Sequence, residues 1–186
     1  MNEKSKAAIC TDEIEAAVYA QLKPLGFRKY GRTLHRFVSG DLSQVIHFQC
    51  GLPSAGPAQQ MWVNLGIRIP ECDERTFSPS PPKRYYREYN CTLRSRLGSI
   101  DGRQELCFDL RKQPSQLLNQ ILPDVLTKVL PVYDVLSSRK AILAHRCDYP
   151  HFDVMGRQLI LLDEHDLRPV WATWKKRTKH CLHNTI

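Results

Sequence analysis

The sequence lacks the features that place a protein in or across a membrane. Its apolar runs are short, such as Leu159–Leu162, whereas a membrane-spanning helix needs roughly 18 consecutive apolar residues. The N-terminus carries lysines, but the polar segment Cys10–Glu13 follows it, in place of the apolar stretch of about 7–15 residues found in a secretory signal. These absences predict a soluble cytoplasmic protein that does not act at a membrane.

The signatures of the common enzyme families are also missing. The chain contains no G-x-S-x-G nucleophile elbow, no phosphate-binding P-loop, no H-E-x-x-H zinc motif and no glycine-rich dinucleotide turn. It has no internal repeat and no low-complexity tract. We therefore expect no cofactor, and the sequence disfavours an enzyme of a common class.

Paired cysteine motifs are absent, although the chain has 7 cysteines. Their number is odd, they are scattered along the chain, and no C-x-x-C occurs. This pattern favours reduced thiols, as in the cytosol, over a disulfide framework. Most of the cysteines are expected to be small core residues.

The remaining composition is that of an ordinary globular protein. With 186 residues, of which 42% are hydrophobic and 25% charged, the chain is long enough for one domain with its own core. We expect a single domain over 1–186, with flexible tails at 1–10 and 181–186 and a proline-rich surface loop at 71–83. The net charge of +8 permits an anionic partner without identifying one.

Residue periodicity predicts an N-terminal helix followed by strands. The helix, at 12–23, begins at the N-cap residue Asp12 and is stopped by Pro24 and Gly26. Alternation of apolar and polar residues then predicts about five strands, at 30–38, 42–50, 61–69, 89–97 and 105–110. The short turns between consecutive strands favour an antiparallel meander over a parallel sheet.

From Pro114 onward the apolar spacing becomes helical. The apolar stripe runs from Leu117 to Leu130, and Pro123 and Pro131 are expected to kink or split this helix. Shorter helices are predicted at 137–145, 155–163 and 167–180. The predicted fold class is therefore α+β, with an N-terminal helix, a mostly antiparallel sheet of about five strands, and a helical C-terminal half packed on or beside the sheet.

One face of the predicted sheet collects polar side chains. Strand alternation places them on the side opposite to the apolar residues Val63 and Leu65. The candidate ligand-binding residues are His47, Gln49, Trp62, Asn64, Arg68, Arg94 and Arg96. Amides and arginines gathered in one place are suited to holding a carboxylate or a phosphate. The favoured alternative is a solvated face on which the last two of these arginines pair with Glu105 or Asp109.

Two other groups of residues have side chains suited to metal binding or catalysis, but the sequence does not place them at the spacing of a known site. Residues 145–151 and 180–183 contain histidines and cysteines of the kind that bind zinc, yet their spacing fits no zinc finger or ribbon, and we predict no metal. Nucleophilic catalysis has its ingredients in Cys91, Cys107, His35, His47 and Asp109. The sequence does not show that these side chains meet.

Basic residues cluster at 28–36, 83–87 and 175–179. Such residues contact phosphates in nucleic-acid-binding proteins, and Tyr85, Tyr86, Trp171 and Trp174 are available for stacking on bases. The clusters are dispersed, however, and no helix-turn-helix or RNA-reading motif accompanies them. Nucleic-acid binding is therefore allowed but not favoured.

Four short motifs, taken in order, resemble those of a bacterial family. They are Leu22–Lys29, Val45–Gln49, Val63–Gly66 and Arg94–Gly98, and the similarity extends over about residues 10–145. The family that they resemble is the domain of unknown function 4304 family. After Gln49 the chain departs from this pattern, since Cys50–Pro53 replaces a more polar stretch that contains an aromatic residue. The resemblance implies a bacterial protein but no particular activity, because the family is uncharacterised.

The sequence thus leads to three functional hypotheses. The first is a non-enzymatic binding module that uses the polar face and the proline-rich loop to hold a protein partner or an anionic ligand. The second is a small enzyme acting on an anionic substrate, with His47 as its acid–base residue. Its binding groups would be Gln49, Asn64, Arg94 and Arg96. The third is a nucleic-acid-binding protein. A convergent cleft would favour the enzyme, and a flat face the binding module.

Overall fold

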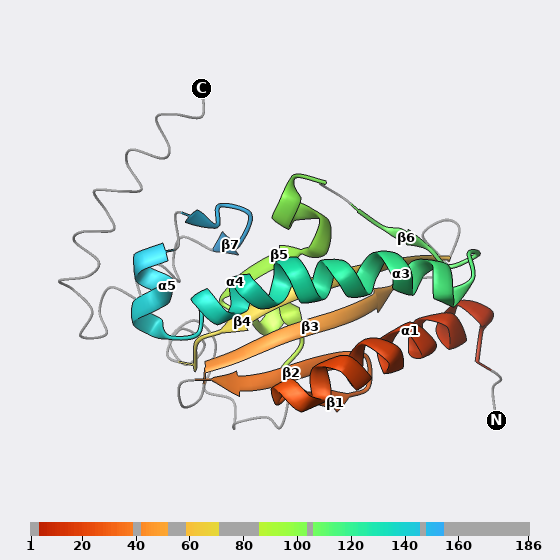
Figure 1. Ribbon diagram of the computed structural model, residues 1–186, viewed down its shortest axis with the longest axis horizontal. Coiled ribbons are helices and arrows are strands. Elements are labelled where there is room, and N and C mark those ends of the chain that lie inside the picture. Colours follow the sequence, from red (N-terminus) through yellow and green to blue (C-terminus); the bar gives the residue numbers. More distant parts are fainter. Residues whose placement is uncertain are drawn as a thin grey trace.

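The protein is built from one antiparallel sheet with helices on one of its faces, as the computed structural model shows (Figure 1). The structure describes residues 4–38, 42–51, 59–70, 86–103, 106–145 and 148–154. The predicted loop at 71–83, the predicted helices at 155–163 and 167–180, and the predicted tail at 181–186 lie outside these residues. The α+β class and the antiparallel sheet are confirmed.

Among the described residues, seven strands make up the sheet, and three of them have only two or three residues. They are β1 (Arg28–Tyr30), β2 (Thr33–Val38), β3 (Leu42–Cys50), β4 (Gln60–Arg68), β5 (Leu93–Arg96), β6 (Phe108–Asp109) and β7 (Asp153–Val154). Their order across the sheet is β1-β2-β3-β4-β5-β7, and β6 pairs with β4 beside this path. The long central strands β3 and β4 therefore carry most of the hydrogen-bonding ladder.

The predicted strand at 30–38 is a hairpin of two strands. The chain reverses at Gly31, whose φ of 55° lies in the left-handed region that glycine adopts at little cost. As a result β1 pairs with β2, with Tyr30 opposite Thr33. The alternation of apolar and polar residues did not reveal this turn, because polar residues continue through it without a break.

The predicted hairpin between 89–97 and 105–110 is wrong. The chain leaves β5 through a 3-10 turn at Leu97–Asp101, and this turn folds tightly back on itself. A Cβ added at Gly98 would lie 2.1 Å from the Arg103 carbonyl oxygen, so only glycine fits there. The chain therefore returns not along β5 but to the start of β4, where Phe108 of β6 lies opposite Met61.

Helix α1 (Lys6–Leu22) begins earlier than the sequence indicated. Ser5 is its N-cap, because its side chain accepts a hydrogen bond from the Ala8 N–H at 3.2 Å. Residues 6–10 thus belong to a helix rather than to a flexible tail, and Cys10 within them is buried. The predicted stop is confirmed, since a 3-10 turn at Lys23–Leu25 ends at Gly26, whose φ is 86°.

The second long helical segment continues through both of its prolines. Helix α3 (Pro114–Asp124) contains Pro123, and α4 (Leu130–Val135) begins just before Pro131. Between them lies a π-helical turn at Val125–Val129, whose wider hydrogen-bonding pattern accommodates residues that lack an N–H donor. Helix α5 (Arg139–His145) follows, close to the predicted 137–145.

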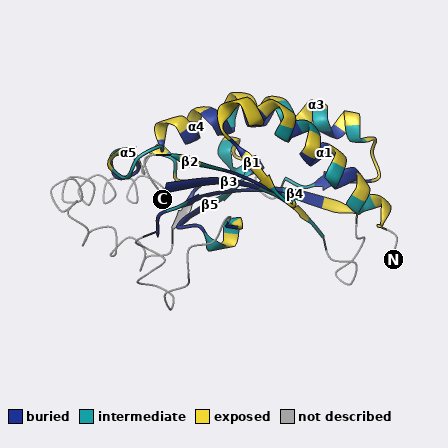
Figure 2. Ribbon diagram, turned by 90° about the horizontal axis from the view of Figure 1, so that it is seen from below, coloured by how far each residue is buried: buried dark blue, intermediate teal, exposed yellow. Residues whose placement is uncertain are grey.

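The apolar core lies between the sheet and the layer formed by α1, α3 and α4, as the burial colours show (Figure 2). Large side chains from both layers are completely buried, among them Phe48, Met61, Leu65, Leu22 and Ile121. On the opposite face, residues 86–91 cross the middle of β4. A Cβ at Gly66 would lie only 2.6 Å from the Cys91 Sγ, so glycine is required for this crossing.

Tyr133 of α4 connects the helical layer to the backbone of the sheet. Its ring is fully buried, and its hydroxyl donates a hydrogen bond to the Val45 carbonyl at 2.5 Å. The same oxygen accepts a hydrogen bond from the Gly66 N–H at 3.1 Å. Since Val45 and Gly66 are opposite each other on β3 and β4, one phenol group bridges the two central strands.

Replacing Tyr133 by phenylalanine is expected to lower the free energy of unfolding by about 1–3 kcal/mol, because a buried N–H and a buried carbonyl lose their partner. Chemical denaturation measures this change. Tyr89→Phe is the matched control, since Tyr89 is 54% exposed and its loss of a hydroxyl should leave stability almost unchanged. Equal effects of the two substitutions would contradict the bridging role.

Candidate functional site

The seven polar residues singled out in the sequence do lie on one face of the sheet. The register of the strands places His47 opposite Asn64, and Asn64 in turn opposite Arg96. Gln49 is opposite Trp62, Ser43 is opposite Arg68, and Gly66 is opposite Arg94. Because side chains alternate along each strand, all seven project away from the helices.

The arginines of this face are occupied by neighbouring groups. The Arg68 guanidinium lies 3.7 Å from the centre of the Tyr86 ring, and that of Arg96 lies 5.8 Å from Trp62. Arg94 lies 3.9 Å from the Glu88 carboxylate. The predicted pairing of Arg94 or Arg96 with Asp109 is wrong, because the Asp109 carboxylate pairs with the Arg111 guanidinium at 2.6 Å. Glu105 lies outside the described residues.

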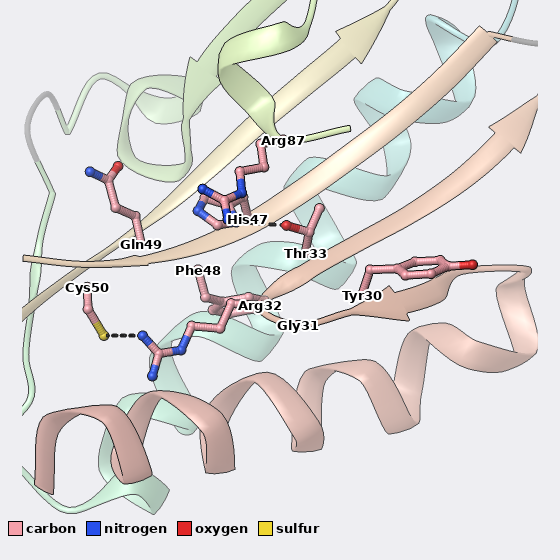
Figure 3. A pocket seen from close by; sticks show the side chains of 9 residues that line it. All are labelled: Tyr30, Gly31, Arg32, Thr33, His47, Phe48, Gln49, Cys50 and Arg87. Atoms are coloured by element: carbon pink, nitrogen blue, oxygen red, sulfur yellow. Dashed lines mark hydrogen bonds between the residues drawn. The ribbon is translucent and has the colours of Figure 1, made fainter. Parts of the chain in front are cut away.

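A pocket of about 420 Å³ opens where the β1–β2 turn meets the end of β3 (Figure 3). Strand β3 extends beyond the last residue that pairs with β2. Residues on both faces of this extension contribute to the pocket walls. The lining residues are Tyr30, Gly31, Arg32, Thr33, His47, Phe48, Gln49, Cys50 and Arg87. Two of the seven predicted residues, His47 and Gln49, therefore line this pocket, and the other five are not among its lining residues.

His47 is held as a neutral imidazole in this pocket. Its Nδ1 lies 2.9 Å from the Thr33 Oγ1, a hydroxyl that is itself almost completely buried. Burial, reinforced by the positive charge of Arg87, lowers the pKa of His47 to about 4, and a hydrogen bond with the Arg32 backbone offsets only part of this. At neutral pH the ring can donate or accept hydrogen bonds but carries no charge.

Gln49 and Arg87 supply the donors of the pocket. The Asn64 Nδ2 donates to the Gln49 Oε1 at 2.7 Å, which fixes the Gln49 amide and leaves its Nε2 as a donor. Arg87 points toward His47 (Figure 3). Within the part of the chain that the structure describes, no carboxylate forms an ion pair with Arg87.

The other chemical constellations are not assembled in the described part of the chain. His47 is bonded to Thr33 and Asp109 to Arg111, so the predicted catalytic ingredients do not form a triad. No group of three or more His, Cys, Asp or Glu residues within the described ranges is arranged to hold a metal. Cys147 and residues 180–183 lie outside those ranges.

The basic cluster at 28–36 is largely neutralised. Lys29 pairs with the buried Glu15, and Arg36 lies 2.5 Å from Asp134. Arg32 lies 2.8 Å from Asp12. These residues attach helices to the sheet and so do not form a continuous basic patch. A helix long and apolar enough to cross a membrane is not found among the described residues.

The sequence-based interpretation missed most of the pocket because its walls combine positions on β1, β2 and β3 with Gly31, Arg32 and Arg87, which belong to no strand. Arg32 follows the turn at Gly31, and Arg87 precedes β5 by several residues. Neither position belongs to the alternating pattern from which the polar face was predicted. Gly31, which allows the β1–β2 turn, was the signal in the sequence that could have indicated the pocket, since it marks the point at which β1 ends and the chain reverses.

His47 should make the protein less stable as the pH falls from about 6.5 to 4. The unfolded chain, with its ordinary imidazole pKa, binds a proton over this range, whereas folded His47 remains neutral. The melting temperature of wild type should therefore drop more steeply over this range than that of His47→Gln. Parallel curves for H47Q and wild type would contradict the burial effect.

The comparison with known proteins gives a family but no activity. A family model described as a domain of unknown function, DUF4304, matches residues 18–134. Neither the curated proteins nor the solved structures gave a match. The matched region runs from within α1 to α4 and includes all the residues that line the pocket. Since the match covers well over half of the chain, and agrees with the four motifs of the sequence, the protein belongs to the DUF4304 family.

Proposed function

We propose that this protein is a non-enzymatic binding protein of the bacterial cytoplasm that holds a small anionic ligand in the pocket between the β1–β2 turn and β3. The observation that carries the proposal is Arg87, a guanidinium that points into the pocket with no carboxylate partner among the described residues. The ligand class is a carboxylate or a phosphate, because guanidinium groups bind both through paired hydrogen bonds.

The composition of the pocket walls supports an anion. None of the nine lining residues is acidic, and of the two arginines among them Arg32 is paired with Asp12, so that Arg87 supplies the positive charge. The Gln49 amide and the neutral His47 add hydrogen-bonding groups without adding negative charge. A volume of about 420 Å³ suits a small molecule rather than a macromolecular surface.

The same geometry favours binding over catalysis. His47 is hydrogen-bonded to Thr33, and no carboxylate that would orient an imidazole for proton transfer lines the pocket. Thr33 as a whole residue is only 2% exposed, so its hydroxyl is not accessible as a nucleophile. Cys10, Cys50 and Cys107 form no disulfide, which fits a reducing compartment such as the cytoplasm.

Calorimetric titration with inorganic phosphate and with succinate tests the proposal. Arg87→Gln should weaken binding of whichever anion binds by roughly tenfold or more, because a charge-assisted hydrogen bond is lost. Arg96→Gln is the matched control, since Arg96 lies on the same face but outside the pocket and should retain the wild-type affinity. Binding should also weaken as the ionic strength rises.

Two results would contradict the proposal. Equal losses in Arg87→Gln and Arg96→Gln would indicate a diffuse attraction to the whole face instead of a pocket. Absence of heat and of NMR shifts at Gln49 and His47 with both anions would show that the pocket is not an anion site.

A further inference from the structure

The pocket lies at the point where the hydrogen-bonding ladder between β2 and β3 stops. The last bond of this ladder runs from the Phe48 N–H to the Arg32 carbonyl, at 2.9 Å. If the same register continued, Tyr30 would be opposite Cys50. The turn at Gly31 instead carries Tyr30 away into β1. The position beside Cys50 is therefore not filled by β2.

The backbone of Cys50 is directed toward this position. Along an antiparallel strand, the N–H and carbonyl groups of successive residues point alternately to the two neighbouring strands. The Phe48 N–H points to β2, and the Gly51 N–H points to β4, where it donates to the Gln60 carbonyl at 2.8 Å. The N–H and carbonyl of Cys50 therefore point to the β2 side, and among the described residues they have no hydrogen-bond partner. Because Cys50 lines the pocket, both groups are available to a ligand there.

The two faces of this gap in the sheet differ. On the helical side, the Arg32 side chain extends along β3, and its Nη1 donates to the Cys50 Sγ at 3.1 Å (Figure 3). On the other side are Gln49 and Arg87, which are both exposed. A ligand that lies beside β3 is thus in reach of the sheet edge and of the Arg87 guanidinium at once, since both belong to one pocket.

The closed end of the gap determines which end of a peptide it accepts. A strand that continues β2 runs antiparallel to β3, so its C-terminus meets Arg32. The terminal carboxylate is then next to the pair formed by Thr33 and His47, toward which Arg87 points (Figure 3). A strand of the opposite direction would place its terminal ammonium beside this guanidinium, in a pocket without an acidic lining residue. The charge of the pocket therefore favours the C-terminus.

We propose that the ligand of the pocket is the C-terminal end of a short peptide, which adds to the edge of β3 in the place that β2 leaves. This inference rests on the proposed function, because it identifies the anion as a peptide carboxylate. The carboxylate accepts hydrogen bonds from the Cys50 N–H and from Arg87, and the N–H of the terminal residue donates to the Cys50 carbonyl. Main-chain hydrogen bonds of this kind give the affinity wherever a peptide extends a sheet.

Calorimetric titration of the full-length chain with trialanine tests the proposal. Acetate is the comparison, since it carries a carboxylate without a peptide backbone. Trialanine should bind about fivefold or more tightly than acetate, because it adds the hydrogen bond to the Cys50 carbonyl. Trialanine amide, which lacks the carboxylate, should bind roughly tenfold or more weakly than trialanine. Arg87→Gln should weaken the binding of trialanine to a similar extent.

Methylation of single peptide nitrogens tests the pairing with β3. A methyl group on the nitrogen of the C-terminal residue removes the donor to the Cys50 carbonyl and should weaken binding by about threefold or more. The matched control carries its methyl group on the nitrogen of the middle residue. That N–H points away from β3, so the control should retain the affinity of trialanine.

Hydrogen exchange of the backbone amides gives a second readout. In the free protein the Cys50 amide should exchange faster than the Phe48 amide, which is bonded to the Arg32 carbonyl. Saturating trialanine should slow the exchange of Cys50 and leave that of Phe48 unchanged.

Three results would overturn the proposal. They are an affinity for trialanine no higher than that for acetate, equal effects of the two methyl groups, and a Cys50 amide whose exchange is not slowed by trialanine. The proposed function would still stand in these cases if phosphate or succinate binds and Arg87→Gln weakens that binding. If no anion binds, both the proposed function and this inference are wrong.

Discussion

The arrangement of this protein depends on the hydrogen bonds that the Tyr133 hydroxyl makes with Val45 and Gly66. These bonds fix Val45 of β3 opposite Gly66 of β4. This one pair sets the register of the other residue pairs of the two strands. A shift of one residue would turn every side chain of a strand to the other face. It would move His47 away from Asn64 and into the apolar layer beneath the helices. The polar face and the pocket therefore both require this register.

Ionic contacts complete the attachment of the helices at the two ends of the sheet. Near α4, the Arg36 guanidinium connects the Gln44 side chain with Asp134. Near α1, Lys29 reaches the buried Glu15, whose pKa is raised by burial and lowered in part by that lysine. Lys29, Arg32 and Arg36, which resemble part of a nucleic-acid-binding cluster in the sequence, thus have a structural role, because each of the three pairs with an acidic residue on a helix.

The sequence predicted those features that depend on local alternation, and it failed where distant segments meet. The faces of β3 and β4 were correct, because alternating residues at Leu42–Cys50 and Met61–Ile69 leave only one consistent choice. The pairing of β6 was not, since it depends on the tight turn at Gly98. Only His47 and Gln49 of the nine residues that line the pocket were predicted, and Arg87 was missed because it lies in a segment whose position no periodicity records.

Arg32 connects the pocket to helix α1 through a single residue. Its carbonyl accepts a hydrogen bond from the Phe48 N–H at 2.9 Å, which ends the pairing of β2 with β3, and its backbone is also hydrogen-bonded to His47. Its side chain passes to the other side of the strand and contacts Cys50. The backbone that shapes the pocket is therefore the backbone that aims the Arg32 guanidinium at α1 and Cys50. A movement of the β1–β2 turn would alter the pocket and the contacts of Arg32 with α1 together, and the left-handed Gly31 beside Arg32 sets the direction in which that turn leaves the sheet.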